Sequence, residues 1–522
     1  MIFRTSFRKQ INAVSKVTAL ILFLFTSLPF IAQEQKKKVK YHHSDELLYD
    51  KELVDAQRLI GNVHLEYEGT HFYSDSAYWY ASEDFDAFSN IRIQRGADYT
   101  VTGDLMTFNR KEKVAVLTNN ARLRDREMTL TSDHLTYNTE TEIANYFGGG
   151  KIVSNANKNV LTSEKGFYHG TTQNFFFRKD VVLKNPDYTV NCDTMQYNNA
   201  TEITYFFGPT TIRGERTTIY CENGYYNTRT DQCRFGKNAT VTSESTVLSG
   251  DSIYYDGRKK IGEVFRNVVI RDTTQSYIIS GDYGKHLEMT KESFVTGRAL
   301  MTQVFEDDSL FMHADTLKSI PDSLGRDVVF AFHHVKLFKT DLQGKCDSLV
   351  YAQTDSTLRM FSSPVLWSEN NQVMGDSISI KTSDGELEAL LVRGNAFIIS
   401  DAEIQSDTSS ASSKYNQVKG RRMTGHFSDN ELNSVYAEGN GQLIYFLTDE
   451  KTGTARTMGL NKGECSNLNI EIHENQITRI RMEKDANSVF NPMRFVGEND
   501  FLLEGFIWRE VERPTNKEEI FE

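Results

Sequence analysis

Cysteine and proline are both scarce in this chain. The 522 residues include five cysteines and seven prolines. So few cysteines exclude a disulfide scaffold as the feature that holds the fold together. Aromatic residues are plentiful by contrast, with 33 Phe and 24 Tyr, so there is ample apolar material for ordered structure.

Catalytic and phosphate-binding motifs are also absent. The sequence contains no G-x-S-x-G, H-E-x-x-H, G-x-x-x-x-G-K-[ST] or EF-hand pattern, and "GGGK" (148–151) precedes no predicted helix. We therefore predict no catalytic residues, no cofactor and no enzyme activity. The pairs His42–His43 and His333–His334 have no ligand cluster around them, so no metal site is predicted.

An excess of positive charge is missing as well. The formal net charge is −12, and a leader holds four of the cations, so the rest of the chain is near −16. Without a basic stripe to replace counterions at phosphates, nucleic acid is excluded as a partner.

Long apolar runs are confined to the N-terminus. Basic residues from Arg4 to Lys16 precede "VTALILFLFTSLPFIA" (17–32), the pattern of a secretory signal peptide over residues 1–32. Phe30 is large for a position close to cleavage, which leaves an uncleaved anchor as the alternative. No later run approaches the ~20 residues that span a membrane. Residues 33–54 are interpreted as a linker.

A short motif dominates the remainder. "CDTMQYN" (192–198) recurs as "CENGYYN" (221–227) and "GDSIYYD" (250–256), each 29 residues after the last. A small residue precedes the acid, and an aromatic residue often follows four places later. The acids lie 29 to 33 residues apart, at Asp75, Asp104, Asp133, Glu164, Asp193, Glu222, Asp251, Asp282, Asp315, Asp347 and Asp376.

A second marker often stands 13 residues before the acid. It occurs at Asn62, Asn120, Asp180, Asn238 and His334, and apolar residues alternate after it, which is typical of half-buried strands. The apolar parity changes at the acid, from three places before it to two and four places after it. A corner or bulge between the small residue and the acid explains this change.

Each repeat of about 29–31 residues is therefore interpreted as one rung of an all-β, elongated β-solenoid. Rungs about 4.8 Å apart predict a rod of about 60 Å. The repeats run over residues 55–405, and the Ser-rich segment 406–418 is interpreted as a loop. Further β repeats follow over 419–490, and 491–522 is interpreted as a C-terminal tail.

Two features of the corners have alternative interpretations. The acids either accept backbone hydrogen bonds of the turn or form a calcium ladder, although the Gly-Gly-x-Gly-x-Asp repeat of calcium-binding β-rolls is missing. Cys192 and Cys221 occupy the same position in consecutive rungs, so they are either two buried thiols or a disulfide.

The repeat resembles the OstA/LptA family of lipopolysaccharide-transport proteins. The resemblance rests on "LIGNVHLEYEG" (59–69), "GDLMTFNRKEKVAVLTNNARL" (103–123), "SDHLTYNTETEIANYFGGGKIV" (132–153) and "AEGNGQLIYF" (437–446). It covers most of residues 55–445. The chain is longer than a minimal LptA and lacks the outer-membrane barrel of LptD.

The resemblance implies a jellyroll-like, V-shaped β-taco that binds the acyl chains of lipid A in the periplasm, at times associated with the outer membrane. It also implies partners of the same fold at the inner and outer membranes, and head-to-tail self-association. The alternative is a structural or adhesive envelope solenoid with a closed core. The expected lipid-binding lining is Val63, Leu65, Ile91, Ile93, Leu123, Leu135, Tyr137, Val181, Leu183, Met195, Tyr197, Ile212, Val241, Ile253 and Tyr255.

Overall fold

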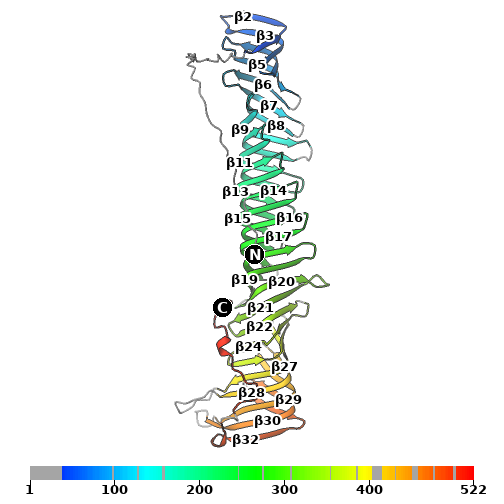
Figure 1. The fold of residues 1–522 in the computed structure, drawn as a ribbon, viewed down its shortest axis with the longest axis vertical. Helices are drawn as coiled ribbons and strands as arrows, with labels where there is room; N and C mark the ends of the chain where they lie inside the picture. The colour runs from blue at the N-terminus through cyan, green and yellow to red at the C-terminus, as the bar shows by residue number, and fades with distance from the viewer. Residues whose placement is uncertain are drawn as a thin grey trace, which may run out of the picture.

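The chain folds into one long rod of antiparallel strands (Figure 1). The computed structural model describes residues 38–522 apart from 97–98, 126–127, 156–158, 245, 273–275, 306–307, 353, 384–385, 403–413, 429–430, 450–455, 474–475 and 498–500. The predicted signal peptide lies outside these residues. The described part forms a 32-stranded sheet with short 3-10 turns near its C-terminus, which confirms the predicted all-β class. None of its helices is long and apolar enough to span a membrane.

The strands follow one another along the rod. The first ten are β1 (Lys40–His43), β2 (Glu46–Asp50), β3 (Val54–Tyr67), β4 (Thr70–Trp79), β5 (Phe85–Arg95), β6 (Tyr99–Asn109), β7 (Val114–Arg124), β8 (Met128–Asn138), β9 (Ile143–Ser154) and β10 (Val160–His169). The next ten are β11 (Asn174–Lys184), β12 (Thr189–Asn198), β13 (Ile203–Arg213), β14 (Thr218–Asn227), β15 (Gln232–Thr242), β16 (Thr246–Asp256), β17 (Ile261–Asp272), β18 (Tyr277–Leu287), β19 (Glu292–Val304) and β20 (Ser309–Pro321).

The C-terminal part contains shorter and longer strands. They are β21 (Asp327–Lys339), β22 (Leu342–Ala352), β23 (Thr357–Phe361), β24 (Val365–Ser368), β25 (Asn371–Met374), β26 (Ser377–Ser383), β27 (Glu386–Asp401), β28 (Tyr415–Ser428), β29 (Glu431–Asp449), β30 (Arg456–His473), β31 (Gln476–Glu483) and β32 (Asn487–Pro492). The 3-10 turns are η1 (Met493–Phe495), η3 (Glu510–Glu512) and η4 (Glu519–Phe521).

A bulge near the middle of each long strand bends the sheet. Between β5 and β6, Ile91 pairs with Gly103 and Phe88 pairs with Leu105, so two residues of β5 oppose Asp104 alone. The two opposing residues, Ser89 and Asn90, have positive φ values of 61° and 52°. Asparagine and glycine tolerate this left-handed conformation, which explains the second marker of the repeat. The bulge also reverses the apolar parity, as the sequence predicts.

The small residue before the acid is required by close packing. A Cβ atom added at Gly250 would lie 2.5 Å from Cγ1 of Val264, and one at Gly281 would lie 2.6 Å from Cγ1 of Val295. Because the neighbouring strand packs its valine against the bend, larger side chains do not fit there.

The acids are held by side chains of the next bend. Asn90 Nδ2 donates to Asp75 at 2.7 Å, and Asn267 Nδ2 donates to Asp251 at 2.9 Å. We expected backbone N–H donors at this position, but these donors are side-chain amides. The amide donors favour a structural role for the acids over a calcium ladder.

Each sequence repeat contains two antiparallel strands, whereas the predicted rod length assumed one strand spacing for each repeat. A repeat therefore advances the rod by about 9.6 Å, or two spacings of about 4.8 Å. The predicted length of about 60 Å was too short for this reason, because it counted one spacing for each rung.

The ends of the repeat region also differ from the sequence prediction. The segment predicted as a linker, residues 33–54, contains the short strands β1 and β2, and both strands pair with β3. Residues 406–413 of the predicted loop lie outside the described residues, and β28 already begins at Tyr415. The sheet continues across this segment, because β27 pairs with β28.

We expect Asn120→Val to lower the free energy of unfolding by about 2 kcal/mol, because a β-branched residue at its φ of 52° is strained. Urea unfolding measures this change. Asn120→Gly is the control: like Asn120→Val it loses the hydrogen bond to Asp104, but glycine accepts this φ, so we expect it to lose only about 1 kcal/mol. Equal losses in the two variants would contradict a conformational role for this position.

Candidate functional site

The bends divide the sheet into two walls that face each other across the interior. From β3 to β22, the second half of each odd-numbered strand and the first half of each even-numbered strand form wall one. The remaining halves form wall two. Residues near the bends lie deep in the interior, and residues near the strand ends form the rim.

The interior is closed between β3 and β10, which we call the closed section. The rim residues Leu65, Ile93 and Leu123 of wall one are at most 2% exposed. Aromatic rings join the two walls here. Phe72 of wall one lies 5.1 Å from Phe85 of wall two, measured between ring centroids. Side chains therefore fill this part of the interior.

A second ring contact across the interior follows in the same section. Tyr99 of wall one and Tyr137 of wall two lie 5.7 Å apart between centroids, and their hydroxyl groups are hydrogen-bonded. Tyr137 is only 2% exposed. Burial and the bond to Tyr99 raise its pKa, so the pair stays neutral and holds the walls together.

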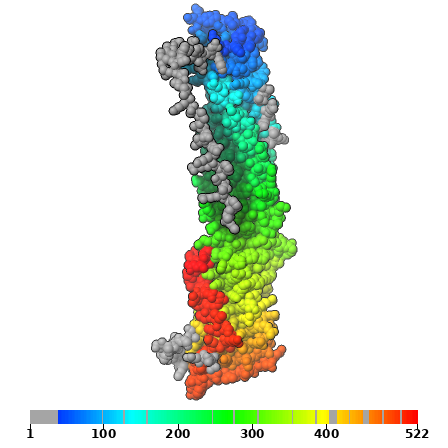
Figure 2. Space-filling model, in the orientation of Figure 1, coloured from blue at the N-terminus to red at the C-terminus, as the bar shows by residue number. Residues whose placement is uncertain are grey.

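The walls separate between β11 and β20, which we call the open section. Leu183 occupies the same place in the repeat as Leu123, yet Leu183 is half-buried. Tyr255 likewise is half-buried where its counterpart Tyr137 is buried. Figure 2 shows a hollow along this part of the rod.

The deep positions of the open section remain buried. Val181 and Met195 are each 1% exposed, and Ile253 is 5% exposed. Exposure therefore increases from the bend toward the rim, as it does in a V-shaped groove with an apolar floor. The rim of this groove is apolar on both walls and includes Leu183, Ile212, Ile219, Tyr226, Val241, Leu248, Tyr255 and Ile270.

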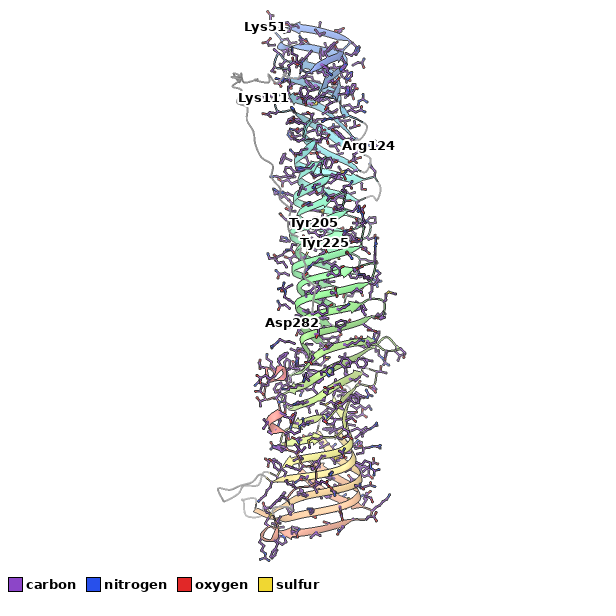
Figure 3. All side chains as sticks on the ribbon, viewed as in Figure 1. Lys51, Lys111, Arg124, Tyr205, Tyr225 and Asp282 are labelled. Atoms are coloured by element: carbon purple, nitrogen blue, oxygen red, sulfur yellow. The ribbon has the colours of Figure 1, made fainter. Side chains whose placement is uncertain are left out.

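The outer face of the open section follows the opposite alternation. Phe206 on β13 is 4% exposed and faces the interior, whereas its neighbour Tyr205 faces outward. Tyr205 pairs with Tyr225 of β14, with 6.3 Å between their ring centroids (Figure 3). The inner and outer faces of one strand can thus be altered separately.

The C-terminal residues 501–522, which we call the strap, pack on the outer face of the rod beyond the open section. Their partners Phe397 and Gln417 alternate along β27 and β28 with the inward-facing Ile398 and Val418. Figure 2 shows the strap lying along the rod and ending next to the hollow. Leu503 is 7% exposed and belongs to a cluster with Phe397, Ile444 and Leu460 of the strands. The tail predicted over 491–522 is therefore a packed part of the rod at these residues.

Two buried glutamines bind the strap backbone. Gln417 on β28 donates to the carbonyl of Phe501 at 2.7 Å and accepts from the N–H of Leu503 at 2.8 Å. Gln372 on β25 makes the same pair of bonds with Ile507 and Arg509, each at 2.7 Å. Both glutamines are 0% exposed, so without the strap their amides would lose these partners.

Ion pairs add to this attachment. Glu512 lies 2.7 Å from Arg509 and 2.6 Å from Lys345 of β22, and these cations lower its pKa from 4.5 to about 2. Because the pKa is lower in the folded protein, the stabilisation is present above about pH 4.5. It is lost as the pH falls through about 2.

The strap ends at β20, where the open section also ends. The ring of Phe521 lies 4.7 Å from His313 on β20, and Arg298 on β19 lies 4.6 Å above the same ring. Ile520 is 1% exposed. The groove is thus bounded by the closed section on one side. On the other side a second buried core of strand residues, including Leu337, Leu349 and Val392, fills the interior, while the strap lies on the outer face.

The fifteen residues expected to line the interior all face it. Those of the closed section are packed core, namely Val63, Leu65, Ile91, Ile93, Leu123, Leu135 and Tyr137. Those of the open section form the floor and rim of the groove, namely Val181, Leu183, Met195, Tyr197, Ile212, Val241, Ile253 and Tyr255.

Sequence reasoning did not include every rim residue. Ile219 and Leu248 stand three places before the acid, an apolar position of the repeat that could have identified them. The strap has no repeat signal, and its glutamine partners look like ordinary strand residues in the sequence.

The corner cysteines do not form the disulfide that the sequence left open. All five cysteines are free and buried. Burial raises the pKa of Cys192 to about 12 and that of Cys221 to about 11, so both stay protonated thiols. They act as the small residue of the bend.

We expect Gln417→Leu to lower the free energy of unfolding by about 2 kcal/mol, because two strap groups lose their buried partner. Limited proteolysis should then cleave near residues 501–508, whereas the wild-type strap should resist. Gln442→Leu, at a half-buried position on β29, is the control. An unchanged cleavage pattern in Gln417→Leu would show that Gln417 does not hold the strap.

Comparison with known proteins agrees with the repeat. A family described as "OstA-like protein" matches residues 36–193 and 189–251. No curated protein matches this chain. Among solved structures, the chain is similar to LptH of Pseudomonas aeruginosa, the LptA-homologous periplasmic component of a lipopolysaccharide transport device. The two share 17% identity over 21% of this chain and 82% of LptH, with a TM-score of 0.20. Residues 36–251 of the chain thus belong to the OstA-like family.

Proposed function

We propose that this protein is a non-enzymatic periplasmic carrier that binds the acyl chains of lipopolysaccharide in the groove of its open section. The observation that carries the proposal is the half-buried apolar rim between β11 and β20. Exposed contiguous apolar surface is uncommon in soluble proteins and marks a binding surface for an apolar partner.

The shape of the groove suits a long apolar ligand. Its floor and both walls are apolar over ten strands, and neighbouring strands lie about 4.8 Å apart. Acyl chains placed along it would contact Met195 and Ile253 near the floor and Leu183 nearer the rim. Membership in the OstA/LptA-like family supports lipopolysaccharide as the source of these chains.

The boundaries of the groove support entry from its open side. The closed section fills the interior toward the N-terminus, and the core around Leu337, Leu349 and Val392 fills it toward the C-terminus. A lipid would therefore enter and leave between the rims. In this arrangement the groove serves as a bounded compartment within a longer bridge.

The ends of the rod are the surfaces for protein partners. At the N-terminal end, β1 and β2 pair with β3 alone among the described residues, and Leu47 and Tyr49 are 51% and 60% exposed. Open strand edges pair readily with further strands. We place inner- and outer-membrane transport components of the same fold, or further copies of this chain, at these ends.

The alternative is a structural or adhesive envelope rod with a closed core. The closed section fits that alternative, but the half-buried rim of the open section favours a carrier. A rod without a ligand would be expected to bury these side chains, because each exposed one forgoes about 1.5–3 kcal/mol of hydrophobic stabilisation.

We expect a photo-crosslinking residue at Leu183 or Tyr197 to capture lipopolysaccharide in cells, because both positions lie at the rim. The same residue at Val182, on the outer face of β11, should give no adduct. Leu123 provides a second control, since it shares the repeat position of Leu183 within the closed section. Mass spectrometry of the adducts identifies the lipid. Blank results at Leu183 and Tyr197 in folded protein would refute a lipid groove and favour the closed-core alternative.

We expect Ile212→Asp to weaken the binding of purified lipopolysaccharide at least tenfold, because a carboxylate at the rim makes the apolar surface costly to cover. Thr211→Asp, on the outer face of the same strand, should bind as the wild type does. Titration of fluorescent lipopolysaccharide measures both affinities. Equal affinities in the two variants would place the lipid elsewhere.

A further inference from the structure

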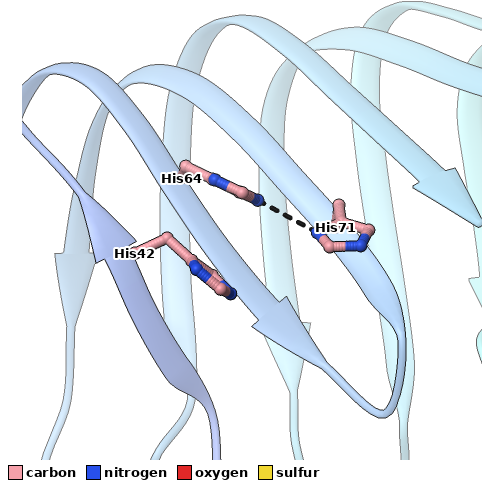
Figure 4. A group of neighbouring side chains, drawn as sticks. All are labelled: His42, His64 and His71. Atoms are coloured by element: carbon pink, nitrogen blue, oxygen red, sulfur yellow. Dashed lines mark hydrogen bonds between the residues drawn. The ribbon is translucent and has the colours of Figure 1, made fainter.

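Three histidines from three different strands meet on the outer face at the N-terminal end of the rod. They are His42 on β1, His64 on β3 and His71 on β4 (Figure 4). One ring nitrogen from each lies within 4.8 Å of the others. Nε2 of His64 is 3.0 Å from Nδ1 of His71, and the ring of His42 stacks on that of His64 with 4.4 Å between centroids.

Strand alternation and register bring these side chains together. Val63 and Leu65 of β3 face the core. Because side chains alternate along a strand, the neighbouring His64 and Glu66 face outward. In the pairing with β4, Glu66 lies opposite His71, which makes His64 and His71 diagonal neighbours. The sequence alone could not indicate this cluster, because only His42 of the adjacent pair His42–His43 belongs to it.

The geometry is close to that of a metal site. Zn–N bonds of about 2.0–2.1 Å place two imidazole nitrogens on a tetrahedral ion about 3.3 Å apart. The 3.0 Å between the nitrogens of His64 and His71 requires only a small rotation to reach that spacing. Three imidazoles are a usual ligand set for zinc and leave a fourth position for water or a carboxylate.

The charged surroundings also fit a cation. Glu66 accepts hydrogen bonds from Lys40 and from Nε2 of His42, each at 2.8 Å, so its carboxylate lies beside the cluster. A carboxylate next to a histidine commonly orients a metal-bound imidazole. On the far side, Arg92 lies over the ring of Tyr73, 4.2 Å from its centroid.

We propose that His42, His64 and His71 form a binding site for a divalent transition-metal ion, with zinc as the best-fitting ion. The site would fasten β1 to β3 and β4. β1 has four residues, all of them exposed, and its pairing with β3 shifts register between Tyr41 and His43. A metal ion would therefore supply attachment that packing does not supply, at the strand edge where another chain would join the rod. This inference does not depend on the proposed lipid binding.

The test uses the untagged full chain, stripped of metal by a chelator and titrated with zinc chloride. Isothermal titration calorimetry should show one zinc ion bound per chain. His64→Ala and His71→Ala should each weaken zinc binding at least tenfold. His43→Ala is the matched control, since His43 lies on the same strand but contacts Asp45 at 3.3 Å, and it should bind zinc as the wild type does.

A second measurement separates metal binding from folding. Zinc should slow amide hydrogen exchange of residues 40–43 in the wild type and leave it unchanged in His71→Gln, a variant of similar size. Unfolding midpoints measured without zinc identify any alanine variant that is misfolded. If one is misfolded, His71→Gln is used in its place. Absence of zinc binding by the wild type would overturn the proposal. Equal affinity in wild type and His71→Gln, or equal losses in His43→Ala, would do the same.

Discussion

The bend in the middle of each long strand is the constraint on which the rest of the structure depends. Two residues of positive φ on one strand oppose a single acid on the next, and the bulge turns a flat sheet into two facing walls. Because the bends stack in register along the rod, a single antiparallel sheet encloses an interior without a second sheet. Every inner residue then belongs to one wall or the other.

Whether that interior is core or groove depends on what spans it. In the closed section, aromatic rings such as Phe72, Phe85 and Phe108 meet across the walls and exclude any ligand. Beyond the open section, a second core that includes Leu337, Leu349 and Val392 fills the interior, and the strap packs on the outer face. In the middle the walls part and the rim stays half-buried. One repeat therefore produces two closed cores and one open groove along one rod.

This division has a consequence for a carrier. A groove bounded at both ends concentrates contact with an apolar ligand over β11–β20 and leaves the ends of the rod free for protein contacts. The histidine cluster lies at one of those ends, on β1, β3 and β4 (Figure 4), whereas the groove is formed by β11–β20. Lipid contact and the attachment of the first strand thus involve separate residues.

The sequence by itself determined the all-β class, the bends and the inward direction of residues such as Leu123 and Leu183. These properties are local, since they follow from alternation along a strand and from the residue types that a bulge tolerates. Only the tertiary structure decided that Leu123 is core and Leu183 is rim, although both hold the same place in the repeat. That difference depends on contacts across the interior, such as that of Phe72 with Phe85. The convergence of His42, His64 and His71 likewise depends on strand register, and no pattern along the chain specifies it.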